Sequence, residues 1–367
     1  MGKPKPVLFQ LKTKLFGGAE RFAVNLLRGL SRELFTPVAF GPSPDDNFAL
    51  AQELDIEVVQ WNPETDFLDS VKKCACDHKV NCIVTLSYRP EFGIAARQLR
   101  IPHIWRVPST PQVNLAREPF RRQATAALAS LADAIVCPAE FVKSSLEDIG
   151  ICGVRLIRNG VDSQFIEAGA GRVVSEDVAL IASVGSFYPQ KRHEIFIQAC
   201  AKLAVVFPRL RFEILGCFSG HPDSLAYREQ IMRMIDGYDL ATRLSVRSIP
   251  VLQASDLRGV DIFVHCSEEE GFGNALAESM ALGVPVLSAR SGGYLELIED
   301  GLSGVFFAPG DCSELANKLE HLIRDCSLRR RLGREANSWV TNNLRYEKCI
   351  NAYERLLLEV IGKGTGP

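Results

Sequence analysis

Two glutamates that flank a glycine-rich loop form the part of the sequence best suited to chemistry. Glu270 comes directly before Gly271-Phe272-Gly273, and Glu278 follows within a predicted helix at 274–282. The apolar run Ile262–His265 predicts a buried strand ahead of this loop. Glycines let backbone N–H groups approach a ligand, and a helix N-terminus favours an anion such as a diphosphate. We therefore expect an anion site at the loop, with both carboxylates binding hydroxyl groups beside it.

Paired glutamates alone are more typical of a solvated loop and a helix surface. The hypothesis of an anion site therefore depends on further residues. Lys191, followed by Arg192, can neutralise a diphosphate, although the spacing fits a solvated loop lysine equally well. Gly17-Gly18 lies between the first predicted strand and helix, where glycines permit close approach to a phosphate or a sugar. A plain strand–helix turn explains that pair as well.

The full string from Glu270 to Val286 resembles the donor-site motif of GT-B glycosyltransferases, in particular the retaining GT4 family of group 1 glycosyltransferases. The motif has two acids, Glu270 and Glu278, with Gly-Phe-Gly after the first and Ser279-Met280-Ala281 after the second. Ser279 stands where alanine is usual. Further matches occur in order along the chain: Gly17-Gly18-Ala19-Glu20, Asn159-Gly160-Val161-Asp162, Val184-Gly185, Lys191, Gly283-Val284-Pro285-Val286, Ser291-Gly292-Gly293, Glu296, Gly301 and Gly304.

The resemblance implies roles for these residues around a nucleotide-diphosphate sugar. Glu278 is expected to bind the ribose hydroxyls and Glu270 the hydroxyls of the donor sugar. Lys191, helped by Arg192, is expected to neutralise the diphosphate as the sugar–phosphate bond breaks. Backbone N–H groups are expected to hold the sugar or its phosphate, and Gly17-Gly18 to face the donor from the N-terminal domain. The residues that carry those N–H groups are Phe272, Gly273 and Asn274.

The sequence departs from the family at two positions. Where members often carry a histidine that approaches the donor sugar, this chain has Pro108, which lacks a suitable side chain. His103 falls too early, inside a predicted strand, and is expected to be structural, while Arg106 is a candidate substitute. Where many members have an arginine after the glycine of the second domain's first loop, this chain has Ser186.

Length and composition indicate a two-domain globular protein. The 367 residues include 42 Lys+Arg and 44 Asp+Glu, with 23% charged and 47% hydrophobic residues, which excludes a disordered chain or a coiled coil. The formal charge of −2 argues against nucleic acid as a partner. We expect an α/β protein of GT-B architecture, with two Rossmann-like doubly wound domains at 1–168 and 175–343 facing a central cleft. The last helix, at 346–361, is expected to pack back on the N-terminal domain.

Short apolar runs alternate with helical patterns over the whole chain, which indicates βαβ units and parallel sheets. Helices are expected between the strands, including one at 46–54, and a Gly- and Ala-rich stretch near 165–176 joins the two series. The predicted strands are Val7–Leu11, Phe35–Phe40, Val58–Gln60, Cys82–Leu86, His103–Val107, Ala134–Cys137, Val154–Ile157, Val178–Val184, Arg211–Leu215, Leu244–Arg247, Ile262–His265, Pro285–Ser288 and Val305–Phe307.

The eleven cysteines are predicted to be reduced and mostly buried, as in a cytosolic protein. Cys74, Cys76 and His78 lack a second ligand pair at a useful spacing, so no metal site is expected. The chain also has no Asp-x-Asp motif of the kind that holds a metal on a diphosphate. No signal peptide or membrane-spanning helix is predicted. The basic run Arg324, Arg329, Arg330, Arg331 and Arg334 is either a peripheral membrane patch or a solvated helix face.

Together these features predict a cytoplasmic, metal-independent retaining glycosyltransferase that needs no cofactor besides its nucleotide-sugar co-substrate. The acceptor is expected to be a glycan, a glycolipid or a small molecule bound by the N-terminal domain. One alternative is a catalytically silent nucleotide-sugar-binding protein. A dinucleotide-dependent oxidoreductase is the other, but the first loop lacks a full Gly-x-Gly-x-x-Gly. The donor base, the sugar, the acceptor, the linkage and the oligomeric state are not encoded in these motifs.

Overall fold

The computed structural model describes residues 3–11, 18–41, 56–86, 89–109, 119–217, 221–249, 251–268 and 270–364. The chain divides into two compact units, which are residues 1–159 with 347–367, and residues 160–346. The division falls before α8 (Ser163–Gly169), a helix inside the segment that we expected to close the first domain at 168. It does so because α8 packs on α11 (Asn274–Ala281) and α13 (Cys326–Asn343) of the second unit. The helix expected at 46–54 lies outside the described residues.

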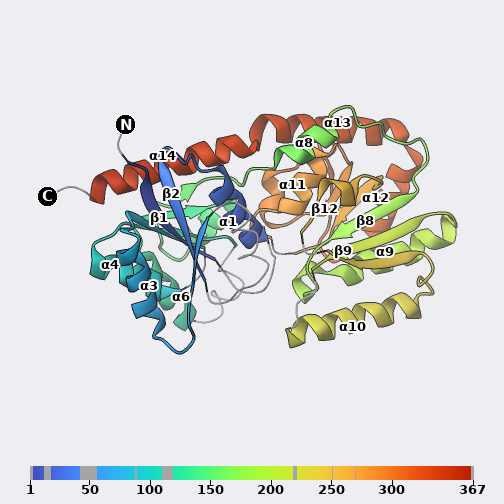
Figure 1. The fold of residues 1–367 in the computed structure, drawn as a ribbon. Coiled ribbons are helices and arrows are strands. Elements are labelled where there is room, and N and C mark those ends of the chain that lie inside the picture. Colours follow the sequence, from blue (N-terminus) through green and yellow to red (C-terminus); the bar gives the residue numbers. More distant parts are fainter. Residues whose placement is uncertain are drawn as a thin grey trace. The chain divides into compact units, whose positions relative to one another are not determined.

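The first unit is built on a seven-stranded parallel sheet in the order β3-β2-β1-β4-β5-β6-β7 (Figure 1). Its central strands are buried along their whole length, as expected for a parallel sheet covered by helices on both faces. The strands are β1 Lys5–Gln10, β2 Phe35–Gly41, β3 Glu57–Gln60, β4 Cys82–Thr85, β5 His103–Arg106, β6 Ala134–Cys137 and β7 Arg155–Leu156; the helices are α1 Gly18–Gly29, α3 Phe67–Asp77, α4 Pro90–Leu99, α6 Pro119–Ala129, α7 Glu140–Glu147 and α14 Tyr346–Gly364.

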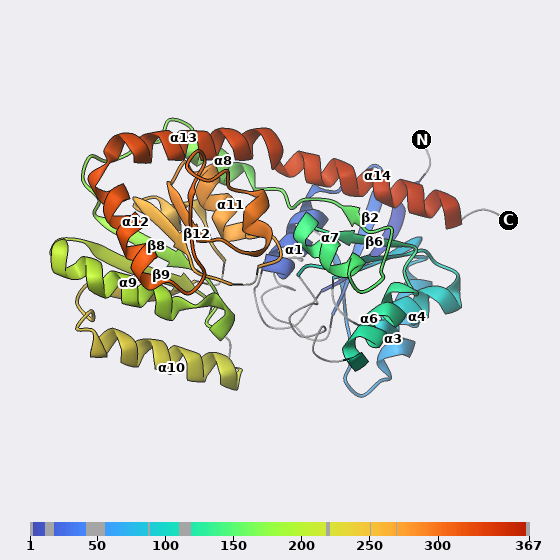
Figure 2. The same ribbon diagram turned by 180° about the vertical axis from the view of Figure 1, so that it is seen from behind.

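The last helix, α14, belongs almost entirely to the first unit although it ends the chain. The ring of its Tyr353 lies 5.5 Å from that of Phe22 on α1, centroid to centroid. Its Glu354 accepts a 2.7 Å hydrogen bond from the backbone N–H of Ser31. Figure 2 shows this helix, in red, beside the early, blue part of the chain. Through these contacts the end of the chain packs on residues 1–159 and forms part of the first unit.

The second unit is also built on a parallel sheet, which has six strands in the order β10-β9-β8-β11-β12-β13. A continuous apolar core joins the sheet to helices α9 and α12 on one of its faces. The elements are β8 Leu180–Val184, β9 Arg211–Gly216, β10 Leu244–Ser248, β11 Ile262–His265, β12 Val286–Ala289, β13 Val305–Phe307, η1 Pro189–Lys191, η2 Ala254–Leu257, η3 Gly292–Glu296, α9 His193–Val206, α10 Pro222–Gly237 and α12 Cys312–Arg324, besides α8, α11 and α13.

The predicted α/β class with two parallel, Rossmann-like sheets is confirmed, and every predicted strand overlaps an observed one. In each sheet the direction of strand addition reverses once, between β1 and β4 and between β8 and β11. Loops that follow the two strands at such a reversal diverge to opposite faces and leave room for a ligand at the carboxyl edge. The candidate site of the second unit lies at its reversal point.

All eleven cysteines are free thiols, and six of them are buried. Among the described residues, no helix combines the length and the apolar character needed to cross a bilayer.

Candidate donor site in the second unit

The two loops that carry the predicted catalytic pair follow neighbouring strands. Ile181 of β8 is paired with Ile262 of β11, so both strands end at the same edge of the sheet. The loop after β8 leads into the single turn η1, which ends at Lys191. The loop after β11 leads through Glu270 to α11. Strand pairing therefore brings residues from distant parts of the sequence to one edge.

Lys191 and Glu270 meet at this edge in an ion pair between Nζ and Oε2. Their side chains are 15% and 24% exposed, so the pair is sheltered but open to a ligand. Burial raises the pKa of Glu270, but the charge of Lys191, the nearby His265 and the hydrogen bonds from Lys191 and Tyr294 together outweigh burial, so the pKa lies below its usual value. The carboxylate is therefore ionised at neutral pH and acts as a hydrogen-bond acceptor only.

The glycine-rich loop is built around positions where a side chain does not fit. Gly273 has a φ of 95°, and a Cβ there would lie 2.6 Å from the ring of Tyr294. Gly293 donates a 3.0 Å backbone hydrogen bond to the carbonyl of Glu270, and a Cβ on it would lie 2.5 Å from the carbonyl oxygen of Gly271. The backbone of the glycine-rich loop is therefore in direct contact with the backbone of η3, and this contact fixes the position of Glu270.

Helix α11 begins directly after Gly273 and presents its first turn beside the loop. The first N–H groups of a helix lie outside its own hydrogen-bond ladder and favour an anion. Phe272 is 4% exposed and packs inward, whereas Asn274 is partly exposed. Glu278 lies one turn after Asn274 on the same face of α11 and is 6% exposed. The structure thus places Asn274 and Glu278 on one helix, with Phe272 and Gly273 in the loop directly before it.

Arg192 adopts a left-handed conformation with a φ of 52° at the junction of η1 and α9. Its Nε atom lies 3.2 Å from Glu194 Oε1 and 3.1 Å from Glu268 Oε1. The guanidinium is thus held between two carboxylates, and its charge is partly compensated. Lys191 is therefore the better-placed cation for a diphosphate.

Several residues of the site were missed in the sequence. Ser267 donates its hydroxyl to the carbonyl of Gln190 at 3.0 Å, and Ser291 donates to the carbonyl of Ser267 at 3.0 Å. These bonds tie the loops after β8, β11 and β12 to one another. Tyr294 and His265 lie beneath the same loops, with the Tyr294 hydroxyl 3.0 Å from His265 Nδ1. Two sequence features could have indicated them: His265 is a polar residue at the end of a predicted strand, and Tyr294 is an aromatic residue directly after Gly292-Gly293.

His193, the first residue of α9, is buried beside two aromatic rings. Its ring is 5.2 Å from Phe187 and 6.2 Å from Tyr227, centroid to centroid. Burial lowers its pKa to about 4, so the imidazole is neutral at physiological pH. This histidine supports the loop after β8 and adds no charge to the site.

The remaining predicted residues, Gly17, Gly18 and Arg106, belong to the first unit. Gly17 is outside the described residues, and Gly18 is the first residue of α1. Arg106, the candidate substitute for the family histidine, is 1% exposed, donates to Asn159 Oδ1 at 2.7 Å and covers the ring of Phe22 at 3.7 Å. Its side chain therefore belongs to the interior of the first unit.

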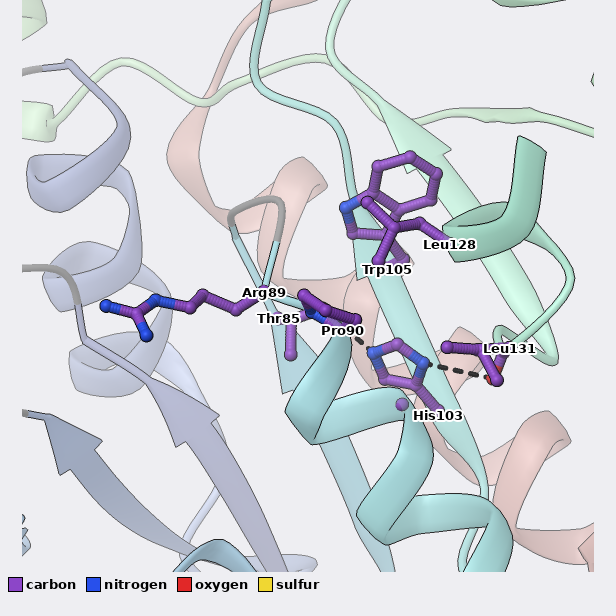
Figure 3. Close-up of a pocket in the computed structure, with 8 residues that line it drawn as sticks. Thr85, Arg89, Pro90, His103, Trp105, Leu128 and Leu131 are labelled. Atoms are coloured by element: carbon purple, nitrogen blue, oxygen red, sulfur yellow. Dashed lines mark hydrogen bonds between the residues drawn. The ribbon is translucent and has the colours of Figure 1, made fainter. Parts of the chain in front are cut away.

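His103 is structural, as predicted. Its Nε2 lies 2.8 Å from Thr85 Oγ1 and its Nδ1 lies 3.2 Å from the carbonyl oxygen of Leu131 (Figure 3). Burial lowers its pKa to about 4. The small hollow beside it is lined by Trp105 and Leu128. Both ring nitrogens of this buried histidine are thus engaged within the first unit.

The predicted basic run on α12 and α13 is engaged in contacts within the second unit. Arg329 is fully buried and donates to four backbone carbonyls. Arg330 pairs with Glu176, Arg331 donates to the carbonyl of Gly301 at 2.8 Å, and Arg324 pairs with Glu320 at 2.9 Å. The run is thus in large part structural.

The fold and the site define a GT-B glycosyltransferase, and comparisons with known proteins agree. The family model described as "Glycosyl transferases group 1" matches residues 170–339, and that of "Glycosyltransferase Family 4" matches residues 16–165. The chain belongs to these GT4-type, group 1 glycosyltransferases.

Among curated relatives, the lipopolysaccharide core biosynthesis glycosyltransferase LpsE of Rhizobium meliloti is 30% identical over 234 residues, which cover 61% of this chain and 64% of LpsE. The N-acetyl-alpha-D-glucosaminyl L-malate synthase of Bacillus anthracis is 28% identical over 188 residues, covering 51% of this chain and 47% of that enzyme. The chain therefore matches less than two thirds of the length of these two relatives.

Among solved structures, Anabaena HepE in complex with UDP and glucose superposes with a TM-score of 0.82 at 18% identity, covering 96% of this chain and 98% of HepE. The sucrose-phosphate synthase of Thermosynechococcus elongatus superposes with a TM-score of 0.80 at 18% identity, covering 98% of this chain and 100% of that one. At this identity the likeness establishes the fold.

Proposed function

We propose that this protein transfers a sugar from a nucleotide-diphosphate sugar to an acceptor hydroxyl and retains the configuration at the anomeric carbon. The observation that carries the proposal is the meeting of Lys191 and Glu270 beside the N-terminus of α11. A cation and helix N–H groups suit a diphosphate, and a carboxylate suits sugar hydroxyls. A nucleotide sugar presents both groups within one molecule.

Bond cleavage places a negative charge on the leaving diphosphate. Lys191 would leave Glu270 and contact this diphosphate, with the first N–H groups of α11 adding their dipole. Glu270 would then bind hydroxyls of the donor sugar near the reacting carbon, and Glu278 the ribose hydroxyls. For retention, the acceptor oxygen attacks the face from which the phosphate departs, and the departing phosphate oxygen takes the acceptor proton.

UDP-sugars are the first donors to test. The HepE structures contain UDP, UDP with glucose, or UDP-glucose, and HepE shares the fold of this chain. LpsE acts in lipopolysaccharide core biosynthesis, so we propose a glycan or glycolipid acceptor as the first class to screen.

Transfer is proposed to need no metal, because Lys191 and the α11 N-terminus supply the positive charge that a metal would otherwise bring to the diphosphate. Turnover should therefore survive dialysis against EDTA and should not increase with added Mg²⁺ or Mn²⁺. A rate that returns only with a divalent ion would contradict this part of the proposal.

The free cysteines favour a reducing compartment, so we propose a cytoplasmic protein. A peripheral contact with the inner membrane face would rest on the exposed arginines Arg324, Arg330 and Arg334. Co-sedimentation with anionic vesicles in low salt tests that contact, and replacement of Arg334 by Glu should weaken it.

The proposed function is tested by a thermal-shift screen with UDP-, GDP-, ADP- and CMP-sugars, followed by a transfer assay. The donor that stabilises the protein is incubated with an acceptor library, and NMR of the product reports the anomeric configuration. An inverted product would overturn the retaining mechanism alone. Binding of a nucleotide sugar without transfer or hydrolysis would favour a catalytically silent protein, and tight binding of a nicotinamide dinucleotide would favour an oxidoreductase.

A further inference from the structure

Tyr294 is a buried tyrosine beneath the donor loop to which the proposed reaction assigns no role. It lies on η3, and its side chain is fully buried. Its ring packs against Gly273, where a Cβ would come within 2.6 Å of it. A phenylalanine would fill the same space, so packing alone does not explain the hydroxyl.

The hydroxyl of Tyr294 lies between two polar side chains. It is 3.0 Å from His265 Nδ1 and 3.4 Å from Glu270 Oε2. His265 ends β11 and is 4% exposed, with its ring centroid 5.0 Å from that of Tyr294. Three segments, namely β11, the loop after it and η3, thus place one connected row of polar groups beneath the site.

The protonation states of these groups set the direction of the hydrogen bonds. Burial lowers the pKa of His265 to about 3, so its ring is neutral and has one N–H to donate. Burial also raises the pKa of Tyr294 well above its usual value, so the hydroxyl keeps its proton. An ionised carboxylate is a stronger acceptor than a neutral ring nitrogen. The hydroxyl proton is therefore directed to Glu270. Because His265 Nδ1 accepts the backbone N–H of Ser267 at 3.5 Å, the ring carries its proton on Nε2, which lies 3.3 Å from the Tyr294 hydroxyl oxygen and can donate to it.

Both contacts to the Glu270 carboxylate end on the same oxygen. Lys191 and Tyr294 each reach Oε2, and in the described part of the chain Oε1 makes no hydrogen bond. This arrangement directs Oε1 to a ligand. During the proposed reaction Lys191 would turn to the diphosphate, and Glu270 would then lose its ion pair.

We propose that Tyr294, held by His265, is a positioning residue that keeps the Glu270 carboxylate aligned with the donor sugar while Lys191 binds the diphosphate. This inference rests on the proposed function. The long 3.4 Å contact is the one expected to shorten when Lys191 leaves, since the carboxylate then has a single partner on Oε2.

Other titratable groups face this cluster and bear on its pH dependence. They are Lys191 from η1, His193 from the start of α9 and Cys266 after β11. Burial keeps His193 neutral, and it raises the pKa of Cys266 so that the thiol stays protonated. The two histidines and Glu270 therefore all change charge below neutral pH, so the Glu270 carboxyl has to be followed by its own signal.

The test compares Tyr294→Phe with wild type in the transfer assay. This change removes one oxygen and keeps the ring, so the thermal midpoint should stay close to that of wild type. We expect kcat to fall roughly 10- to 100-fold, because a hydrogen bond to a charged group is lost in the transition state. The inhibition constant of UDP, which lacks the sugar, should not change. A purely structural role would move both the UDP constant and the thermal midpoint.

Tyr353→Phe is the matched control, because Tyr353 is also fully buried but lies on α14 in the first unit. Its kcat should equal that of wild type. If Tyr294→Phe does not fold, two variants of His265, the residue that holds Tyr294, test the same inference. His265→Gln keeps an N–H donor near the Nε2 position and should retain more turnover than His265→Leu.

A second readout does not depend on turnover. The ¹³C chemical shift of the Glu270 carboxyl, assigned with Glu270→Gln, should titrate at a higher pH in Tyr294→Phe than in wild type. If wild type transfers sugar and Tyr294→Phe matches it in kcat and in this titration, the inference is overturned and the function stands. If wild type transfers no sugar, the proposed function fails, and the titration still decides whether Tyr294 holds Glu270.

Discussion

Lys191 Nζ contacts Glu270 Oε2 although the two residues are 79 positions apart in the sequence. The contact exists because β8 and β11 are neighbours in the second sheet and the loops after them share its carboxyl edge. It joins the residue suited to a diphosphate with the residue suited to a sugar. One ligand can therefore contact both charges.

Lys191→Ala should lower turnover by about 100- to 1,000-fold, because the leaving diphosphate loses its nearest cation. Lys191→Arg should restore part of it. Lys202→Ala is the control, since this exposed lysine of α9 bonds to Ser313, away from the loop. Initial rates with a saturating donor measure the effect. Wild-type rates in Lys191→Ala would remove Lys191 from the site.

Glu270→Ala should abolish measurable turnover while the protein remains folded. The fold should survive because Lys191 is partly exposed and can be solvated once its partner is gone. Circular dichroism and a thermal melt would verify folding, and the transfer assay would measure the loss. A fully active Glu270→Ala variant would show that another residue binds the donor sugar.

Gly293→Ala should distort the donor loop, because the new Cβ would meet the carbonyl oxygen of Gly271 at 2.5 Å. Backbone must move to relieve this contact, so we expect a stability loss of about 1–3 kcal/mol and a large loss of turnover. In Gly259→Ala the new Cβ meets nothing within 4 Å, and both quantities should stay near wild type. Equal behaviour of the two variants in urea unfolding would contradict the prediction.

Arg329→Ala should destabilise the second unit by about 3–5 kcal/mol, since four carbonyls lose a buried charged donor. Those carbonyls belong to Leu322, Ile323, Ser175 and Glu176. Arg330→Ala removes only an exposed pair with Glu176, so its unfolding curve should stay close to that of wild type. Urea unfolding curves of both variants measure the difference.

Stability should fall as the pH drops from about 6.5 to about 4. The folded-state pKa values of His193 and His265 are lowered to about 4 and about 3, so below pH 6.5 the unfolded chain binds more protons than the folded one. Each histidine should cost about 1–2 kcal/mol by pH 5. His265→Asn should flatten this slope in urea unfolding, and an unchanged slope would contradict the prediction.

Much of the fold follows from local patterns in the sequence. The strand predicted at Ile262–His265 is β11, because a short apolar run between polar residues fits a strand buried on both faces. Helix α8 was not predicted, since its Gly- and Ala-rich sequence reads as a linker. Its Gly169 lies so close to α11 that a Cβ would stand 2.1 Å from the carbonyl oxygen of Ala281. Close packing, which local spacing does not encode, makes that segment a helix.

The sequence by itself determined the composition of the candidate site, because Glu270, the glycine loop and Glu278 lie within one short segment. Tertiary structure alone decided what supports Glu270. Tyr294 contacts Glu270, and His265 contacts Tyr294, only in the folded second unit. Arg329 was expected in a surface run, but it is buried and donates to the carbonyls of Ser175 and Glu176. Contacts between residues far apart in the chain depend on how the strands pair and the helices pack, and no local spacing specifies them.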